Sequence, residues 1–291
     1  MTTQPQISTL LTRGIECASY KWIPVDGAQI RGVAVVYHGF GAHSRYPTVH
    51  YASSLLAKNG FVVYAMDLPG HGASPGVRGL LTGVDHLVED GLAIAKHAIA
   101  DSSMMKSNVE LPLFLVGSSM GGAIALSVAK KMSDKIKGVV MLAPMLSLNV
   151  GSAARTALWF LSMIVPEMPL IPSSATNSER QYRDVGRRDE CDKDTLTYKG
   201  KMRPQSALTC IEMTDHIQQS FHEIDVPFLC MIADEDVVVD NSISEMFMTK
   251  SPSKDKTMKS YAALHGLLCE PSSLLEVIEA DLAQWLLSRC P

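Results

Sequence analysis

The chain has 291 residues, enough for one large domain with a full hydrophobic core. Its formal charge is −4 and no basic stretch carries interleaved aromatic residues, so the composition excludes a nucleic-acid-binding protein. Six widely separated cysteines without a CxxC pair, and a start that lacks the basic and apolar parts of a signal peptide, favour a cytoplasmic protein with reduced thiols.

The first half of the chain alternates apolar strands with helices. An opening hairpin is predicted with strands over residues 14–22 and 29–31 around Asp26–Gly27. Apolar runs predict buried strands over residues 33–37, 61–66, 113–116 and 136–142. Amphipathic periodicity and turn residues predict helices over residues 47–59, 85–100 and 122–131. This order predicts a mostly parallel sheet with helices on both faces.

The alternation stops after Pro144. Residues 145–224 contain an apolar stretch, several prolines and then many charges, which predicts a mostly helical insertion above the C-terminal edge of the sheet. An apolar stretch that simply joins the core is the alternative. Strands resume over residues 227–232 and 256–261, so residues 1–144 and 225–291 form the predicted core. A C-terminal helix follows, with a buried stripe of Leu275, Ile278, Leu282 and Trp285.

The sequence Gly-Ser-Ser-Met-Gly places Ser119 at the centre of a Gly-x-Ser-x-Gly motif. The motif alone is weak, because three fixed positions recur by chance. Here a short apolar strand precedes it and a helix follows it, and this strand–turn–helix context lifts a serine hydroxyl above the sheet edge. We therefore predict that Ser119 is a nucleophile.

A serine nucleophile needs a base and an acid that orients the base. In a sheet with this turn they follow the serine in the order acid, histidine, each after a strand. Among nine histidines only His265 follows the last strand. The acid follows the strand that ends near Ile232, where Asp234, Asp236 and Asp240 compete. Spacing alone does not separate Asp234 from Asp236.

Acyl transfer also needs two hydrogen-bond donors for the oxyanion. One is predicted to be the amide of Met120, the residue after the nucleophile. The other is predicted to be the amide of Phe40, in the loop after the strand that ends at Tyr37. His38-Gly39 would form the tight turn that aims the Phe40 amide.

Three glycine-rich stretches carry recognisable motifs: HGFGAHS at 38–44, DLPGHGASPG at 67–76 and GSSMGG at 117–122. Together they closely resemble the monoacylglycerol lipase-like family of α/β-hydrolases, and residues 255–259 and the His265 region fit as well. The resemblance covers most of the chain outside the insertion. Plant relatives that cleave phenolic esters and proteins labelled lysophospholipases share it.

The resemblance implies an α/β-hydrolase fold in which residues 145–224 are the cap, or lid, that shapes an apolar acyl tunnel and often faces membranes. The family's acid precedes a valine-containing segment, which matches Asp236 rather than Asp234. Three positions depart from the family: Ser118 replaces His or Glu, Ile232-Ala233 replaces His-Gly, and Ala42 replaces the Glu near the glycerol end in animal relatives. The last change leaves the head group open.

The leading interpretation is a serine carboxylester hydrolase that cleaves monoacylglycerol into fatty acid and glycerol through an acyl-enzyme, with no metal or organic cofactor. Its partner is a small lipid ester. Arg45, Trp159 and Leu161 are predicted to bind substrate. The apolar surface from Leu158 to Ile164 is predicted to line an acyl pocket in part and to meet a membrane surface in part, without spanning it.

Two other interpretations remain open from the sequence. The first is a lysophospholipase or a phenolic-ester esterase built on the same motifs. The second is a ligand-binding protein that kept the fold and lost turnover, against which a complete Ser–His–Asp set argues. For the polar end of the substrate, His43 and Arg45 are the candidates near Ala42, although Arg45 fits an anchoring role in its loop better. We expect weak discrimination among small alcohol head groups.

Overall fold

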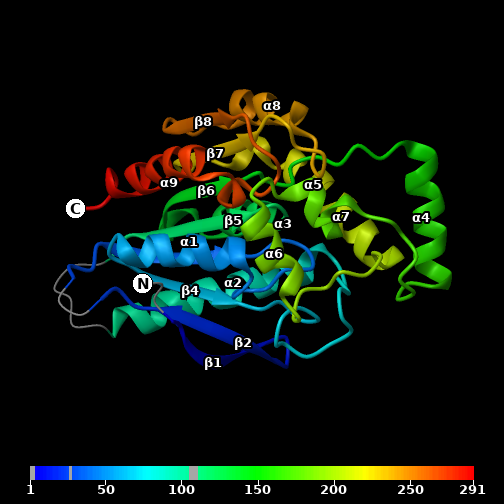
Figure 1. The fold of residues 1–291 in the computed structure, drawn as a ribbon, viewed down its shortest axis with the longest axis horizontal. Coiled ribbons are helices and arrows are strands. Elements are labelled where there is room, and N and C mark those ends of the chain that lie inside the picture. Colours follow the sequence, from blue (N-terminus) through cyan, green and yellow to red (C-terminus); the bar gives the residue numbers. More distant parts are fainter. Residues whose placement is uncertain (1–3, 26–27, 105–110) are drawn as a thin grey trace.

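The computed structural model describes residues 4–25, 28–104 and 111–291. These residues form a sheet of eight strands in the order β1-β2-β4-β3-β5-β6-β7-β8 (Figure 1). The strands are β1 Gln6–Thr12, β2 Ile15–Trp22, β3 Gly32–Tyr37, β4 Phe61–Met66, β5 Leu113–Ser118, β6 Ile136–Leu142, β7 Phe228–Ala233 and β8 Lys256–Tyr261. β1 pairs antiparallel with β2, and β2 pairs antiparallel with β4. All the other neighbouring strands in this order pair parallel. The predicted α/β architecture is confirmed.

Apolar layers cover both faces of the sheet, because neighbouring residues of a strand point to opposite sides. Val35 packs toward one layer and Val36 toward the other. The helices of the Val35 layer are α2 Val84–Ser103, α3 Met120–Lys131, α7 Pro204–Gln219 and α8 Ser244–Lys250. The helices of the Val36 layer are α1 Pro47–Lys58 and α9 Ser272–Leu287. All four residues of the predicted C-terminal stripe are buried on α9.

The predicted opening hairpin was wrong in the position of its turn and of one of its two strands. β1 pairs with β2 across a turn at Arg13-Gly14, where φ is +47° and +76°, as a two-residue hairpin turn requires. Residues 29–31 are not in a strand, and Asp26–Gly27 lies outside the described residues. β1 escaped notice because it is an edge strand whose side chains are mostly exposed, so it lacks the apolar pattern of a buried strand.

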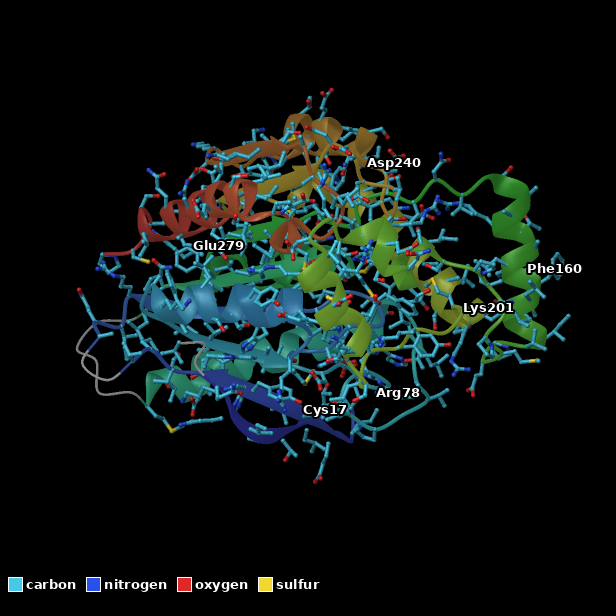
Figure 2. All side chains as sticks on the ribbon, in the orientation of Figure 1. Cys17, Arg78, Phe160, Lys201, Asp240 and Glu279 are labelled. Carbon is cyan, nitrogen blue, oxygen red and sulfur yellow. The ribbon has the colours of Figure 1, made fainter. Side chains whose placement is uncertain are left out.

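The segment between β6 and β7 contains α4 Ser152–Ile164, α5 Ser178–Gln181, α6 Val185–Lys193 and α7. α7 packs one face against the core, where Met213 and Ile217 are fully buried. α4 packs on α7 at the edge of the molecule, away from the sheet (Figure 1). Of its large apolar side chains only Leu158 is buried against the core, whereas the others are exposed, and Phe160 points outward (Figure 2). Among the helices of the described ranges, none is long and apolar enough to cross a bilayer.

Candidate active site

Ser119 occupies the sharp turn between β5 and α3. Its φ is +54°, a left-handed value that strains a residue with a Cβ. The Ser119 N–H donates to Leu142 O at 3.0 Å, and the Met145 N–H donates to Ser119 O at 3.0 Å. The end of β6 and the loop after it therefore hold the strained backbone in place from both sides.

Two glycines let neighbouring segments approach Ser119 closely. A Cβ on Gly121 would collide with the carbonyl oxygen of Tyr37, so α3 begins directly against the end of β3. A Cβ on Gly39 would lie 3.3 Å from the Ser119 Cβ. The loop that carries the Phe40 amide thus passes beside the serine. Met120 is the first residue of α3, where a backbone N–H has no carbonyl one turn earlier to bond.

Asp236 and His265 face each other from the loops after β7 and β8. Asp236 Oδ2 lies 2.7 Å from His265 Nδ1, and the two side chains are 0% and 6% exposed. Asp236 Oδ1 accepts the N–H groups of Val238 at 2.8 Å and Val239 at 3.0 Å. These bonds fix the carboxylate, which leaves His265 Nδ1 as the donor and Nε2 free to act as a base.

The two competing aspartates point elsewhere. Asp234 is exposed and accepts a hydrogen bond from the Ser260 hydroxyl. Asp240 accepts the Ser242 N–H at 2.9 Å, and this bond holds the pKa of Asp240 below its usual range. Only Asp236 among the three is bonded to His265 in the described part of the chain. The geometry thus separates residues that spacing alone left open.

Two polar side chains support the Phe40 loop: that of His38, which was predicted only as part of the tight turn, and that of Asp67, for which no role was predicted. His38 Nε2 accepts the Leu68 N–H at 3.0 Å, which leaves the ring proton on Nδ1 near Gly39 O; burial lowers the pKa of His38. Asp67 accepts the Ser44 N–H at 2.7 Å. Both residues follow buried strands at the same sheet edge as Ser119, and this position is the signal that could have identified them.

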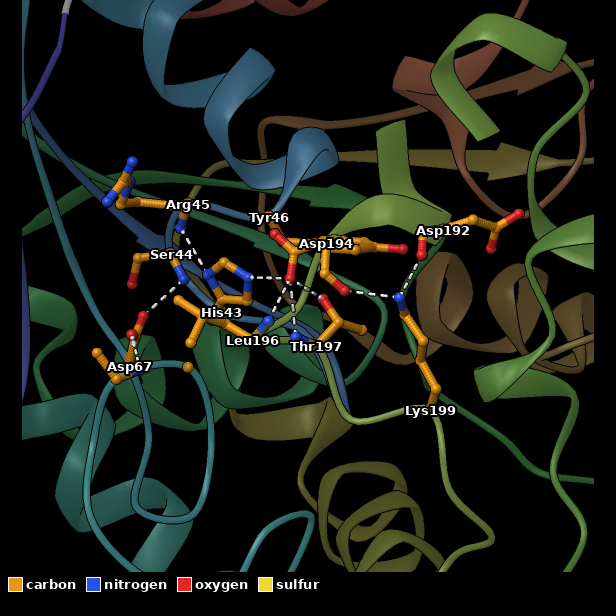
Figure 3. Close-up of polar contacts among 12 residues, drawn as sticks. His43, Ser44, Arg45, Tyr46, Asp67, Asp192, Asp194, Leu196, Thr197 and Lys199 are labelled. Carbon is orange, nitrogen blue, oxygen red and sulfur yellow. Dashed lines mark hydrogen bonds and ion pairs between the residues drawn. The ribbon is translucent and has the colours of Figure 1, made fainter. Parts of the chain in front are cut away.

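His43 connects the Phe40 loop to the insertion (Figure 3). Its Nε2 lies 3.0 Å from Asp194 Oδ1, and its Nδ1 accepts the Arg45 N–H at 3.2 Å. Burial alone would raise the pKa of Asp194, but hydrogen bonds from His43 and Thr197 outweigh it and hold that pKa low. Tyr198 N–H also donates to Gly41 O at 2.8 Å. Both ring nitrogens of His43 are therefore occupied within the protein.

Ser119 and His265 line one small pocket, walled by the Phe40 loop, α5, α6 and the segment after α6. Its other lining residues include Phe40, Ala42, Tyr46, Gln181, Tyr182, Cys191, Asp192, Thr197, Tyr198 and Lys199. Ala175 and Thr176 form part of the same wall. This pocket therefore combines the reacting side chains with hydroxyl, amide and charged groups that can contact a polar substrate end.

A larger open groove of about 750 Å³ lies on the other side of the segment 171–176. Residues 171–174 line the groove, while residues 175–176 line the Ser119 pocket. Its apolar walls are Leu148, Val150, Leu158, Leu161, Ile171, Met202, Ile211, Val237 and Val239. Ser119, Asp236 and His265 do not line the groove, but Val237, which directly follows Asp236 in the chain, does. The apolar walls can take an apolar chain.

The three predicted substrate-binding residues lie in different places. Leu161 lines the groove on α4. Trp159 is 47% exposed on α4 and packs edge-on against Phe160, outside the groove lining. Arg45 is exposed, and its side chain points away from the His43–Asp194 contact (Figure 3). The structure does not bring Arg45 or Trp159 into the Ser119 pocket, so their roles stay predictions.

Comparisons with known proteins agree with this architecture. A family model described as serine aminopeptidase, S33, matches residues 28–272. Monoglyceride lipase of Homo sapiens is 27% identical, with 89% of this chain and 83% of that protein covered. Caffeoylshikimate esterase of Arabidopsis thaliana is 25% identical, with 91% and 80% covered. The fold matches a soluble variant of Saccharomyces cerevisiae monoglyceride lipase with a substrate analogue, at a TM-score of 0.87, 21% identity and coverages of 100% and 97%.

Proposed function

We propose, from the premise that this chain belongs to the serine aminopeptidase S33 family of α/β-hydrolases, that it cleaves monoacylglycerols. The chain is an ester-hydrolysing enzyme of the monoglyceride lipase-like type. The observation that carries the proposal is the buried Asp236–His265 pair, whose His265 lines the same pocket as Ser119, together with the apolar groove that Val237 lines. A fluorophosphonate probe that fails to label Ser119 would favour a ligand-binding protein instead.

In the proposed mechanism, Ser119 Oγ attacks the ester carbonyl while His265 Nε2 takes its proton. Asp236 accepts the Nδ1–H bond and stabilises the imidazolium. The amides of Phe40 and Met120 donate to the oxyanion. His265 then gives the proton to the departing alcohol, and a water molecule activated by His265 hydrolyses the acyl-enzyme to fatty acid.

Residues 145–224 act as the cap in this proposal, and the groove holds the acyl chain with Leu161 in its wall. The outer surface of α4 and the residues after it would meet the lipid surface. The exposed apolar side chains there are Trp159, Phe160, Met163, Ile164, Met168 and Leu170. Such a one-sided apolar surface binds in the interface of a bilayer and does not cross it. A cytoplasmic location is supported by six cysteines that are all free.

The polar end of the substrate would lie in the Ser119 pocket near Ala42. His43 cannot bond it without losing Asp194, and Arg45 lies outside the pocket lining. Weak selection among small alcohols is therefore proposed. The test is kcat/KM for one acyl chain on glycerol, methanol and glycerophosphocholine. A preference for glycerophosphocholine over both others would replace the monoacylglycerol proposal with a lysophospholipase.

A phenolic-ester esterase is the second candidate, because the plant caffeoylshikimate esterase matches this chain about as well as the human lipase does. The discriminating feature is the apolar groove, which a short aromatic acyl group would leave mostly empty. A caffeoyl ester belongs in the same kinetic comparison. A higher kcat/KM for the caffeoyl ester than for the long-chain glycerol ester would favour the esterase.

A further inference from the structure

Arg183 joins three segments that are distant in sequence. It follows α5 in the insertion, and its Nη2 lies 2.9 Å from Glu235 Oε1 in the loop after β7. Its Nε lies 2.9 Å from Glu270 Oε2 in the loop after β8. One guanidinium therefore pairs with a carboxylate from each of the two loops that carry the candidate acid and base.

Each of these carboxylates is coupled to a triad residue. Glu235 directly precedes Asp236 in the chain. Glu270 Oε1 accepts the N–H of Leu264 at 2.7 Å, and Leu264 directly precedes His265. On the other side of His265, the Gly266 N–H donates to Gln181 O at 2.8 Å. The backbone is thus held on both sides of the histidine by partners that depend on residues 181–183 of the insertion.

The burial of Glu270 makes the contact with Arg183 important. The Glu270 side chain is 0% exposed, whereas those of Arg183 and Glu235 are 38% and 54% exposed. Burial raises the pKa of Glu270, and Arg183 opposes this shift. Ionising a carboxylate in such a site without a partner is costly, so Glu270 without Arg183 could ionise only if the surrounding loop moved to bring it to water.

We propose that Arg183 is a positioning residue, by which the seated insertion holds the loops of residues 234–240 and 262–270 in the register that the Asp236–His265 hydrogen bond requires. The proposal rests on the proposed function of Asp236 and His265. It assigns to the insertion a second task besides covering the acyl groove. Turnover then depends on whether residues 181–183 are seated against the two loops.

The charged groups that act on Glu270 directly are Arg183, which favours its ionised form, and Glu235, which disfavours it. Other titratable groups around residues 267–270 are Cys269 itself, Tyr51 on α1, Tyr182 after α5, and, at α6, Asp184, Arg187, Glu190 and Cys191. Arg187 bonds the Leu268 carbonyl at 3.1 Å and stacks on Tyr51. In the described structure Arg183 is thus the cation paired with Glu270.

The test compares Arg183→Met with Arg183→Met/Glu270→Gln and with Arg180→Met, a matched control for an exposed arginine on α5. The readout is kcat and KM for a p-nitrophenyl ester as a function of pH, with thermal unfolding followed in parallel. We expect Arg183→Met to lower kcat about tenfold or more at neutral and alkaline pH, because small misplacements of catalytic groups have large effects on rate. KM should stay within about threefold, since the groove is untouched.

Addition of Glu270→Gln should restore most of the lost kcat and remove the alkaline loss, because glutamine cannot ionise. Arg183→Lys should retain an intermediate kcat, as an ammonium keeps the charge without the forked geometry. Equal kcat for wild type and Arg183→Met would overturn the proposal. So would a double variant that is no better than the single one.

The design separates this proposal from the proposed function. Wild-type protein without esterase activity would reject the function itself, whereas an active wild type with an equally active Arg183→Met rejects only the positioning role. Where Arg183→Met unfolds at the assay temperature, the double variant decides. A folded and active double variant supports the role, and an inactive one overturns it.

Discussion

Ser119 combines a strained backbone with a side chain that must stay accessible. Its left-handed φ is sustained by hydrogen bonds to Leu142 and Met145 on the neighbouring strand and loop. The strain turns the hydroxyl toward the pocket that also holds His265. Ser118, one residue earlier at the end of β5, lines the same pocket without the strain.

Ser119→Ala should lower kcat by ~10⁴-fold or more and leave the fold intact, because the triad acts as a unit. Ser118→Ala is the matched control and should change kcat far less. Steady-state hydrolysis of a p-nitrophenyl ester measures both. Loss of activity in the Ser118 variant with retention in the Ser119 variant would refute the assignment of the nucleophile.

Asp236→Asn should lower kcat by ~10⁴-fold, because an amide at this position favours the wrong tautomer of His265. Asp234→Asn should have a much milder effect, since Asp234 bonds Ser260 at the surface. The pH–rate profiles of both variants provide the check. A severe loss for Asp234→Asn together with an active Asp236→Asn would contradict the geometry.

His71 should make stability depend on pH. Burial lowers its pKa to about 3, and its Nε2 has no partner in the described structure. The unfolded chain binds the proton more readily than the folded chain does. Protonation of His71 therefore leaves the free energy of unfolding unchanged above pH 6.5 and lowers it increasingly as the pH falls toward 3. The slope is about 1.4 kcal/mol per pH unit.

Urea unfolding between pH 7 and 4 measures this dependence. His71→Gln, which cannot titrate, should show a shallower loss of unfolding free energy than wild type. His222→Gln changes an exposed histidine and should leave the slope unchanged. Parallel curves for wild type and His71→Gln would exclude the effect.

α4 is the element whose sequence and surroundings disagree most. It is strongly apolar, yet only Leu158 and Ser162 are buried on it. Phe160 is 55% and Ile164 is 76% exposed. In water such a surface is unfavourable unless a partner or a lipid surface covers it.

Phe160→Glu/Ile164→Glu should weaken binding to phospholipid vesicles by about tenfold or more, because both apolar contacts are replaced by charges. Turnover of a short, dissolved p-nitrophenyl ester should not change. Ile7→Glu is the control, since Ile7 on β1 is equally apolar and 64% exposed. Vesicle sedimentation that gives equal binding for all three proteins would remove the membrane role of α4.

At the scale of the whole molecule, the sequence predicted the parallel sheet well, because its strands are buried on both faces and read as apolar runs. β4, β6 and β8 match the predicted ranges, residue for residue. The edge strand β1 was missed, since an exposed edge carries no such run. α8 was missed as well, a seven-residue helix too short for a clear period.

The residues of the candidate site likewise divide into those that a local sequence pattern predicts and those that it does not. Ser119 and His265 were predictable because a motif and the chain order point to them. Asp236 needed the resemblance or the structure, since two aspartates stand two residues apart. Arg183 and Asp194 could not be predicted, because their roles depend on contacts with residues about 50 and 150 positions away in the sequence. Long-range pairing of this kind leaves no local pattern.

The insertion is attached to the rest of the protein unequally along its length. The Asp184 N–H donates to Cys269 O at 3.0 Å, and the Tyr198 N–H donates to Gly41 O. Backbone hydrogen bonds to the core therefore hold the chain on both sides of α6. α4 instead packs against α7, and the Arg155–Asp215 ion pair joins the two helices near the first turn of α4. In hydrogen–deuterium exchange, the amides of α4 should therefore exchange well before those of α6. The groove would then open by a rotation of α4 alone about Gly151 and Pro166, and the loops that carry Asp236 and His265 would keep their positions.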